Sequence, residues 1–204
     1  MYTGITRGTF PVVHLERRPD LLTYQVELPA ELIDGLECGA SVSIDGVCQT
    51  VVAIEGYRVR FDAITETLEL TTLGDLEVGQ PVAVERSARV GDEVGGHDVA
   101  GHVRGTGTVR TRKVEGNVWD LQIEVPKSWM SYIPTKGFIA VDGSSLTVGE
   151  RDPAGTFWIH LIPETVRLTN LGEKKEGDRV NIELDARTVA IVDTVERVLA
   201  ERET

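Results

Sequence analysis

The sequence contains one motif twice, as IDGVCQTV at residues 44–51 and as VDGSSLTV at residues 141–148. Asp, Gly, Thr and Val occupy the same places in both copies, while the small residue in the middle changes from Cys48 to Ser145. The copies lie 97 positions apart, which is too long a period for a solenoid repeat. A repeat of this length predicts a duplicated domain.

The repeat extends well beyond this motif. ITETLELTTLG (64–74) and IPETVRLTNLG (162–172) agree at 7 of 11 positions, where average composition gives roughly one match by chance. Single residues recur at the same offset of 97 or 98, among them Gly4 with Gly101 and Pro29 with Pro126. We therefore predict two homologous domains, residues 1–96 and 97–185, followed by a separate C-terminal segment, residues 186–204.

Both repeats carry the pattern of antiparallel β-strands. LTYQVEL (22–28), YRVRFDAI (57–64), WDLQIEV (119–125) and RVNIEL (179–184) alternate apolar with polar residues, and the inner face of the second would carry Tyr57, Val59, Phe61 and Ala63. Such alternation is typical of strands with one face on a core and one in water. Short strands separated by Gly and Pro turns favour small barrels. We predict an all-β protein of two barrels in tandem, with brief helical turns after Pro29 and Pro126.

The C-terminal segment follows a different period. Between Ala186 and Glu203 apolar residues recur at three- and four-residue spacing, at Val189, Val192, Val195 and Leu199, which predicts an amphipathic helix. This helix could cap its own barrel or bind copies of itself. An apolar stripe placed after two complete barrels favours oligomerisation, and the capping alternative stays open.

Composition favours a globular protein and argues against nucleic-acid and membrane partners. The chain has 204 residues, a net charge of −12, 41% hydrophobic and 26% charged residues, which is typical of a soluble globular protein. No cluster of Lys and Arg is present to bind a phosphate backbone, so we expect no nucleic-acid partner. No apolar run reaches membrane-spanning length and the first residues lack a signal-peptide core, so we expect no membrane association. Two cysteines do not make a disulfide framework, which favours a reducing cytoplasm.

The glycine-rich stretch GDEVGGHDVAGHVRGTG (91–107) carries two histidines, His97 and His102. Their five-residue spacing does not place them on one helix face, and Cys48 alone cannot complete a tetrahedral zinc site. The glycines do not lie between a strand and a long helix, as a dinucleotide-binding loop requires. A connection between domains explains the glycines, but it does not explain His102.

Two related pockets are expected at equivalent points of the repeats. Cys48 and Thr50 in the first, and Ser145 and Thr147 in the second, supply small hydrogen-bonding groups near strand ends. Such groups suit a flat polar heterocycle better than a charged phosphate. Each of these residues alone fits an ordinary turn or strand position equally well, so the prediction depends on their recurrence in both repeats.

Several segments, in order, resemble the riboflavin synthase family of the alpha-chain type. They are MYTGI (1–5), GGHDVAGH (95–102), DGSSLTV (142–148), HLIPET (160–165), NIELD (181–185) and DTVERVLAERE (193–203), so the resemblance spans the whole chain. It implies tandem six-stranded antiparallel Greek-key barrels, and a homotrimer assembled through the C-terminal helices. Association with a lumazine synthase shell is left open.

The resemblance also implies a reaction, the last step of riboflavin biosynthesis. Two molecules of 6,7-dimethyl-8-ribityllumazine undergo dismutation, in which one donates a four-carbon unit to the other, to give riboflavin and 5-amino-6-ribitylaminouracil. No metal or organic cofactor takes part. Each barrel is expected to bind one molecule, with the N-terminal barrel of one subunit facing the C-terminal barrel of a neighbour.

The binding residues implied by the resemblance fall into two sets related by the repeat offset. The first lumazine is expected to contact Cys48, Gln49, Thr50, Asp62, Ala63, Ile64, Thr65, Glu66, Thr67, Gly101, His102 and Val103, with Lys136 reaching it from another chain. The second is expected to contact Gly4, Ile5, Thr6, Ser145, Leu146, Thr147, Ile162, Pro163, Glu164, Thr165, Val166 and Arg167.

Dismutation requires unlike pockets, because one substrate loses a proton while the other accepts a nucleophile. The repeats differ at Cys48 against Ser145, Ile5 against His102 and Ser87 against Asp185. Histidine side chains ordinarily titrate at about pH 6.5 and can therefore exchange protons at neutral pH. We expect His102 to transfer protons. The groups expected to orient or activate the substrates are Cys48, Ser41, Thr147, Asp142 and Asp185. Asp142 has a twin in Asp45, and a structural role in the shared Asp–Gly turn is an open alternative.

Three residues depart from the family pattern. Tyr2 stands in place of a phenylalanine, Val47 in place of a frequent cysteine, and Gln49 in place of a leucine. The alternative function is that of a non-catalytic lumazine- or flavin-binding protein of the same fold. Relatives of that kind have degraded motifs in the second barrel, whereas DGSSLTV and HLIPET are intact here, which favours the enzyme.

Overall fold

The repeated Asp–Gly motif forms the same hairpin in both repeats. In the computed structural model, which describes residues 1–202, Asp45 and Gly46 connect β3 (Ser41–Ile44) to β4 (Val47–Glu55). Asp142 and Gly143 connect β9 (Phe138–Val141) to β10 (Ser144–Thr147) in the same way. Both turn residues have positive φ, at 46° and 82° in the first hairpin and 44° and 81° in the second. A two-residue type I′ turn requires this geometry and Asp–Gly tolerates it, so the motif fixes the hairpin.

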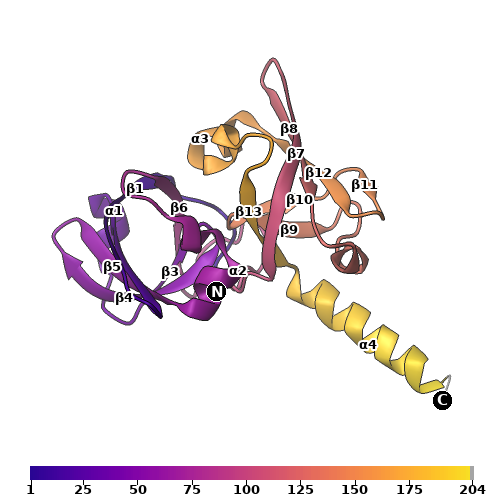
Figure 1. Ribbon diagram of the computed structural model, residues 1–204, viewed down its shortest axis with the longest axis horizontal. Helices are drawn as coiled ribbons and strands as arrows, with labels where there is room; N and C mark the ends of the chain where they lie inside the picture. Colours follow the sequence, from indigo (N-terminus) through magenta and orange to yellow (C-terminus); the bar gives the residue numbers. More distant parts are fainter. Residues whose placement is uncertain (203–204) are drawn as a thin grey trace.

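The N-terminal barrel is closed and antiparallel (Figure 1). Its strand order is β1-β2-β5-β4-β3-β6, a Greek-key order. The predicted alternation is confirmed in β2, where Leu22, Tyr24 and Val26 are fully buried. The expected inner position of Tyr57 is wrong, because this residue lies in the turn before β5 and is 60% exposed. The remaining elements are β1 (Thr9–Arg17), β2 (Leu21–Glu27), α1 (Ala30–Ile33), β5 (Arg58–Ile64), α2 (Thr65–Leu70), η1 (Thr72–Asp75) and β6 (Pro81–Arg86).

The C-terminal barrel repeats this arrangement with one strand divided. The counterpart of β4 is split into β10 and β11 (Arg151–Asp152), which form the two ends of a seven-stranded sheet. Between them, the Gly149 amide donates to the Trp158 carbonyl at 2.8 Å, and the Trp158 amide donates to the Glu150 carbonyl at 2.8 Å. These bonds continue the pairing across the gap. The other elements are β7 (Gly105–Glu115), β8 (Val118–Glu124), η2 (Lys127–Tyr132), β12 (Thr156–Leu161), α3 (Pro163–Leu168), η3 (Asn170–Glu173) and β13 (Arg179–Leu184). The helical turns predicted after Pro29 and Pro126 are α1 and η2.

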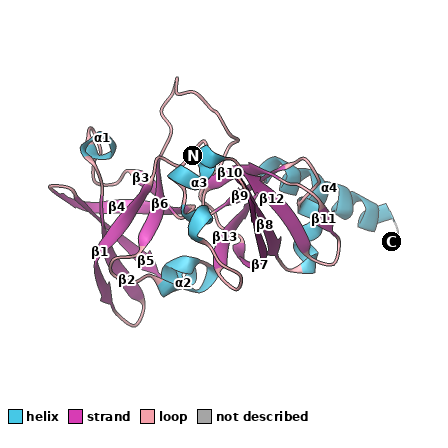
Figure 2. Cartoon of the chain, turned by 90° about the horizontal axis from the view of Figure 1, so that it is seen from above, coloured by secondary structure: helices cyan, strands magenta, loops and turns pink. Residues whose placement is uncertain are grey.

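The barrels lie side by side (Figure 2) and exchange their leading segments. We call residues 1–6 the N-terminal strap and residues 97–103 the connecting strap. The N-terminal strap binds the C-terminal barrel, where the Ser145 amide donates to the Gly4 carbonyl at 2.8 Å. The connecting strap binds the N-terminal barrel, where the Cys48 amide donates to the Gly101 carbonyl at 2.9 Å. Equivalent contacts in both directions are typical of an isologous pair.

A buried glutamate holds each strap. Glu85 accepts hydrogen bonds from the amides of Thr3 at 2.7 Å and Gly4 at 3.1 Å. Its repeat counterpart Glu183 accepts from the amides of Ala100 at 2.7 Å and Gly101 at 2.8 Å. Because each carboxylate accepts from two backbone donors that no strand pairs, each strap is fixed to the barrel that it leads into as well as to the barrel that it covers.

The two Asp–Gly turns meet between the barrels. A Cβ atom on Gly46 would lie 2.4 Å from the Gly143 amide nitrogen, so no larger residue fits there. Asp45 is buried and accepts from Asn170 Nδ2 at 2.9 Å. Burial, together with the neighbouring Asp142 carboxyl, raises the pKa of Asp45 to about 7, and Lys174 opposes part of this effect. An acidic group that prefers its neutral form therefore lies at the centre of the interface between barrels.

The raised pKa of Asp45 predicts a pH-dependent stability. The folded chain holds this proton up to about pH 7 while the unfolded chain releases it near pH 4, so stability falls as the pH rises between these values. Asp45→Asn removes the titration and is expected to lose less free energy of unfolding between pH 5 and pH 8, by roughly 2 to 3 kcal/mol. Urea unfolding at both pH values, with the exposed Asp20→Asn as control, measures the difference. Equal losses in wild type and Asp45→Asn would show that Asp45 does not titrate in this range.

The predicted C-terminal helix is confirmed as α4 (Ala186–Arg202), and the last two residues of the predicted segment lie outside the described residues. It projects away from both barrels (Figure 1). Only its beginning packs on the C-terminal barrel, through Val189 and through the Tyr132 hydroxyl, which donates to Asp193 at 2.6 Å. Beyond that point Ile191, Val195 and Leu199 are 64%, 51% and 54% exposed at four-residue spacing. Within residues 1–202, no helix has the length and apolar character needed to cross a membrane.

Candidate functional site

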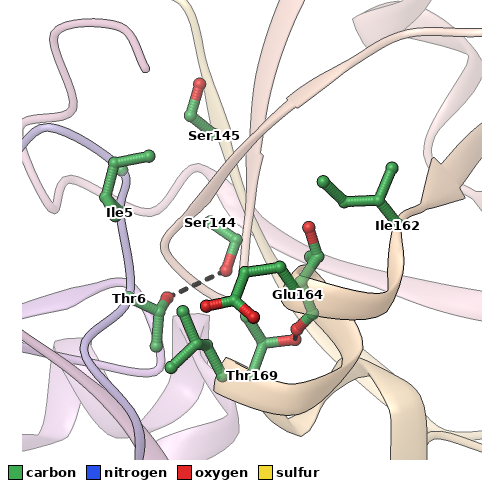
Figure 3. Close-up of a pocket in the computed structure, with 10 residues that line it drawn as sticks. Ile5, Thr6, Ser144, Ser145, Ile162, Glu164 and Thr169 are labelled. Carbon is green, nitrogen blue, oxygen red and sulfur yellow. Dashed lines mark hydrogen bonds between the residues drawn. The ribbon is translucent and has the colours of Figure 1, made fainter. Parts of the chain in front are cut away.

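A pocket of about 190 Å³ lies where the N-terminal strap crosses the C-terminal barrel (Figure 3). The strap contributes one wall, and β10 with both ends of α3 contributes the others. Thr6 and Ser144 join the walls through their hydroxyl oxygens, which lie 2.9 Å apart. We call this the C-terminal pocket, and its lining residues are Gly4, Ile5, Thr6, Ser144, Ser145, Ile162, Glu164, Thr165, Leu168 and Thr169.

The pocket brings together much of the predicted second binding set. From that set, Gly4, Ile5, Thr6, Ser145, Ile162, Glu164 and Thr165 line it. Leu146, Thr147, Pro163, Val166 and Arg167 lie on the same strand and helix without lining it. Ser144, Leu168 and Thr169 were not predicted, although Ser144 lies within the repeated motif and its bond to Thr6 depends on a contact between segments far apart in sequence.

Gly4 fits tightly against the barrel. Its φ is 74°, and a Cβ atom there would lie 2.5 Å from the Ser145 Cβ and 2.9 Å from the Ser145 amide nitrogen. Any other residue would face both a strained backbone conformation and a clash with β10. Glycine at this position therefore sets the distance between strap and barrel, and with it the shape of the pocket.

His97 contacts the same pocket from the connecting strap. Its Nδ1 lies 2.6 Å from Ser145 Oγ, and its ring stacks on Phe138 at 5.0 Å between centroids. Burial lowers the pKa of His97, while Asp185 and Asp98 act in the opposite direction. The imidazole is therefore neutral at neutral pH and can either donate to Ser145 or accept from it. Sequence reasoning considered this histidine only as a metal ligand and missed its contact with the repeated motif.

By the repeat offset, the equivalent positions on the N-terminal barrel are Cys48 and Gly101, together with Ile64, Glu66 and Thr67 at the start of α2. We call these residues the N-terminal site. Gly101 mirrors Gly4, since its φ is 79° and a Cβ atom there would lie 2.6 Å from the Cys48 Cβ. Ile64 and Glu66 are exposed, as Ile162 and Glu164 are in the other repeat. The two barrels therefore present the same backbone arrangement to a ligand.

The remaining members of the first set are divided between core and surface. Gln49 is buried, accepts from the Tyr24 hydroxyl at 3.3 Å and donates to the Cys48 carbonyl at 2.9 Å. Ala63 is also buried, whereas Thr50, Asp62 and Thr65 are exposed. Val103 belongs to the connecting strap, which covers this barrel. Gln49 and Ala63 thus support the N-terminal site from the core side.

The two sites differ in polarity at equivalent positions. The hydrogen-bonded pair Thr6 and Ser144 corresponds to Val103 and Val47, which cannot form such a bond. Ser145 corresponds to Cys48, and Ile5 corresponds to His102. The C-terminal pocket therefore has a hydroxyl pair and a serine where the N-terminal site has two valines and a thiol.

The six predicted catalytic residues do not all meet. Ser41 and Cys48 lie on adjacent strands of the N-terminal barrel, and His102 follows Gly101 in the connecting strap. His102 is exposed and lines a second cavity of about 320 Å³ beside the start of α4. Thr147 is exposed at the end of β10.

Two aspartates and one lysine of the predicted set have other surroundings. Asp142 is buried between the barrels, where it accepts from the Asn181 amide at 2.7 Å and lies 3.0 Å from Lys174 Nζ. These contacts favour the structural alternative for Asp142. Asp185 caps α4, accepting from the Thr188 amide and hydroxyl, both at 2.7 Å. Lys136 is exposed in the turn before β9 and has a positive φ of 66°.

Comparisons with known proteins agree on one family. The family described as lumazine-binding domain matches residues 3–87 and again residues 100–185. The chain is 52% identical over 204 residues to the protein named riboflavin synthase from Escherichia coli (strain K12), covering all of this chain and 95% of that protein. It is 40% identical over 200 residues to riboflavin synthase from Chlamydia pneumoniae, covering 98% of both.

Solved structures show the same fold. LumP complexed with riboflavin superposes with a TM-score of 0.85 at 26% identity, covering 91% of this chain and 100% of that chain. LumP complexed with 6,7-dimethyl-8-(1'-D-ribityl) lumazine superposes with a TM-score of 0.81 at 27% identity, covering 90% and 98%.

Proposed function

The chain belongs to the riboflavin synthase family of lumazine-binding proteins, and on this premise we propose how its two barrels share one reaction. Each barrel binds one molecule of 6,7-dimethyl-8-ribityllumazine, and the pair is converted to riboflavin and 5-amino-6-ribitylaminouracil. The observation that carries this proposal is the duplicated site: Gly4 on Ser145 and Gly101 on Cys48 create the same wall twice in one chain. A reaction between two identical lumazine molecules needs two similar binding sites.

Because the C-terminal pocket and the N-terminal site differ in polarity, the two lumazine molecules have different surroundings. In the C-terminal pocket, Ser145 with its neutral partner His97 offers a hydrogen-bonding pair to one lumazine. At the N-terminal site, Cys48 and the apolar Val47 and Val103 surround the other. Because the two protonation states of a substrate are stabilised differently by such surroundings, the sites favour different roles for two identical molecules.

The exposed stripe of α4 supports a homotrimer. Ile191, Val195 and Leu199 form an apolar surface that nothing else within residues 1–202 covers. In such a trimer the N-terminal site of one subunit would face the C-terminal pocket of a neighbour, with Lys136 supplied by another chain. Holding two reactants in contact contributes on the order of 7 to 11 kcal/mol to a bimolecular step. Assembly would therefore be part of catalysis.

We also propose a reducing, cytoplasmic location. Both cysteines, the exposed Cys38 and the half-buried Cys48, are free thiols, which supports it.

His102 is proposed to transfer protons, and this role predicts a loss of turnover in His102→Gln. Glutamine keeps a hydrogen-bonding group but cannot exchange a proton at neutral pH, and general acid–base groups contribute about a hundredfold or more to rate. We expect kcat to fall by at least about tenfold, because His102 is exposed and water can replace part of its role. His14→Gln, at an exposed histidine on β1, is the matched control. Unchanged turnover in His102→Gln would remove His102 from the mechanism.

A lumazine- or flavin-binding carrier is the second candidate, because the chain superposes on LumP structures with bound riboflavin and lumazine. Incubation of the protein with 6,7-dimethyl-8-ribityllumazine decides between them. The enzyme forms riboflavin, seen by its absorbance, together with an equal amount of the pyrimidine product. A carrier binds the lumazine and leaves it unchanged.

A further inference from the structure

The Tyr2 side chain of the N-terminal strap reaches the N-terminal site. Its hydroxyl donates a hydrogen bond to Cys48 Sγ at 3.2 Å. The ring is buried, with 1% of its surface exposed, and packs with Val99 and Ala140 against Cys48. Tyr2 therefore crosses from a strap that covers one barrel to a reactive group that belongs to the other.

The backbone on both sides of the Tyr2 ring is fixed. Its amide donates to the Val99 carbonyl at 2.6 Å, and its carbonyl accepts from the Val99 amide at 3.0 Å. Thr3, the next residue, donates to Glu85 through its amide and its hydroxyl, both at 2.7 Å. The ring edge is held by Gly101, where a Cβ atom would lie 2.9 Å from Tyr2 Cε2. With backbone and ring both held, the hydroxyl has one available position.

The hydroxyl remains a donor at all ordinary pH values. Burial raises the pKa of Tyr2 strongly, and Cys48 and Glu85 raise it further, while Ser41 acts in the opposite direction. A protonated phenol can always donate to a neighbouring sulfur, which is a weak acceptor. Ser41, Tyr2 and Cys48 thus form one connected polar group.

In the second repeat, the residue equivalent to Cys48 has a different hydrogen-bond partner. Ser145, the counterpart of Cys48, is bonded by His97 Nδ1 at 2.6 Å. Val99 stands at the repeat position of Tyr2 and carries no polar group. In both repeats a strap residue is hydrogen-bonded to the small polar residue of the motif. This strap residue is a tyrosine in the first repeat and a histidine in the second.

We propose that Tyr2 is a positioning residue, whose hydroxyl holds the Cys48 thiol in one orientation at the wall of the N-terminal site. This inference deepens the proposed function and rests on it. Tyr2 acts through Cys48, so its hydroxyl matters only while a hydrogen-bond acceptor is present at position 48. Without that hydroxyl the thiol can rotate between staggered positions, and only some of these face the ligand.

A double-mutant cycle tests the proposal in the full chain. Tyr2→Phe keeps the ring packing and removes only the donor. We expect kcat to fall roughly three- to tenfold, the effect of one ordinary hydrogen bond, with KM and riboflavin affinity nearly unchanged. In a Cys48→Ala background the same substitution should have no further effect, and in a Cys48→Ser background its effect should persist because serine also accepts. Cys38→Ala, at the exposed cysteine, is the matched control.

Four outcomes are separable. If wild type and Cys38→Ala form no riboflavin, the proposed function fails before the cycle begins. If wild type is active and Tyr2→Phe has no effect, or has the same effect in the Cys48→Ala background, the positioning role is overturned. If Cys48→Ala is too slow for steady-state measurement, single-turnover rates at enzyme excess, together with the Cys48→Ser arm, decide the result. A loss of riboflavin affinity in Tyr2→Phe would show a packing role and would likewise overturn the proposal.

Discussion

Replacing Ile191, Val195 and Leu199 together with glutamate is expected to leave a folded monomer that binds lumazine but turns over about a hundredfold or more slowly than wild type. These three side chains are at least half exposed and form one stripe along α4. Charges on that stripe disfavour its burial against other subunits. The barrels do not depend on these residues, so folding and single-site binding should survive.

Point substitutions test the role of assembly more specifically than truncation before Ala186 does. Truncation should also leave barrels that bind ligand and turn over poorly, but it would remove Val189 from the C-terminal core and Asp193 from the Tyr132 hydroxyl. The triple variant keeps these contacts. Arg197→Glu, on the opposite face of α4, controls for added negative charge, and its loss of a surface ion pair with Glu201 should cost little.

Sedimentation measures the assembly state, and initial rates of riboflavin formation measure turnover at the same protein concentrations. In the triple variant, trimer assembly and the rate of riboflavin formation should both fall. In the control, both should stay at the wild-type level. A variant shown to be monomeric that retains the wild-type rate would mean that each chain is complete by itself.

The barrel architecture was predictable from the sequence because its determinants are local. Alternation in LTYQVEL and RVNIEL marks strands, and the Asp–Gly pairs at 45–46 and 142–143 fix two hairpins. The expected solvent exposure of the polar face is wrong for RVNIEL, because Asn181 and Glu183 are buried and bonded to Thr72 and to the Gly101 amide. The repeat then shows that both halves fold alike. The division between β10 and β11 was not predictable, because hydrogen bonds of Gly149 and Glu150 to Trp158 depend on tertiary pairing.

The exchange of straps between barrels left no signal in the sequence. Contacts such as Gly4 with Ser145 join segments that are far apart, and neither hydrophobic period nor turn chemistry records them. For the same reason the Thr6–Ser144 bond and the His97–Ser145 contact were missed. The roles predicted for individual site residues came from a family resemblance, and they stay proposals.

One core feature was present in the sequence and could have been found by aligning the repeats. Tyr24 and Gln49 are bonded in the N-terminal barrel, and their repeat counterparts are Leu121 and Leu146. Two polar residues replace two apolar ones together, which is the pattern expected when a buried group must find a partner. Gln49 had been noticed alone, as a departure from the family.

The second large effect is expected at the two strap glycines. Gly4→Ala places a methyl group 2.5 Å from the Ser145 Cβ, and Gly101→Ala places one 2.6 Å from the Cys48 Cβ, each at a φ that alanine resists. Each variant should displace the strap residues at and after the substituted glycine and so lose one binding site, which leaves one bound lumazine per chain instead of two. Because the reaction needs both molecules, each variant alone should turn over about a hundredfold or more slowly. Equilibrium binding of lumazine confirms which variants retain a single site.

Mixed assemblies of these two variants test the central claim most directly, namely that unlike sites on neighbouring chains form one reaction centre. Gly4→Ala subunits retain the N-terminal site because Tyr2 stays paired with Val99 and bonded to Cys48. Gly101→Ala subunits retain the C-terminal pocket because His97 stays stacked on Phe138 and in contact with Ser145. Co-expressed with two different tags and purified through both, mixed trimers should recover about a third of wild-type turnover, since one of the three facing pairs in any mixed trimer then joins two intact sites. Turnover that stays at the level of the single variants, in assemblies proven to contain both chains, would contradict the account.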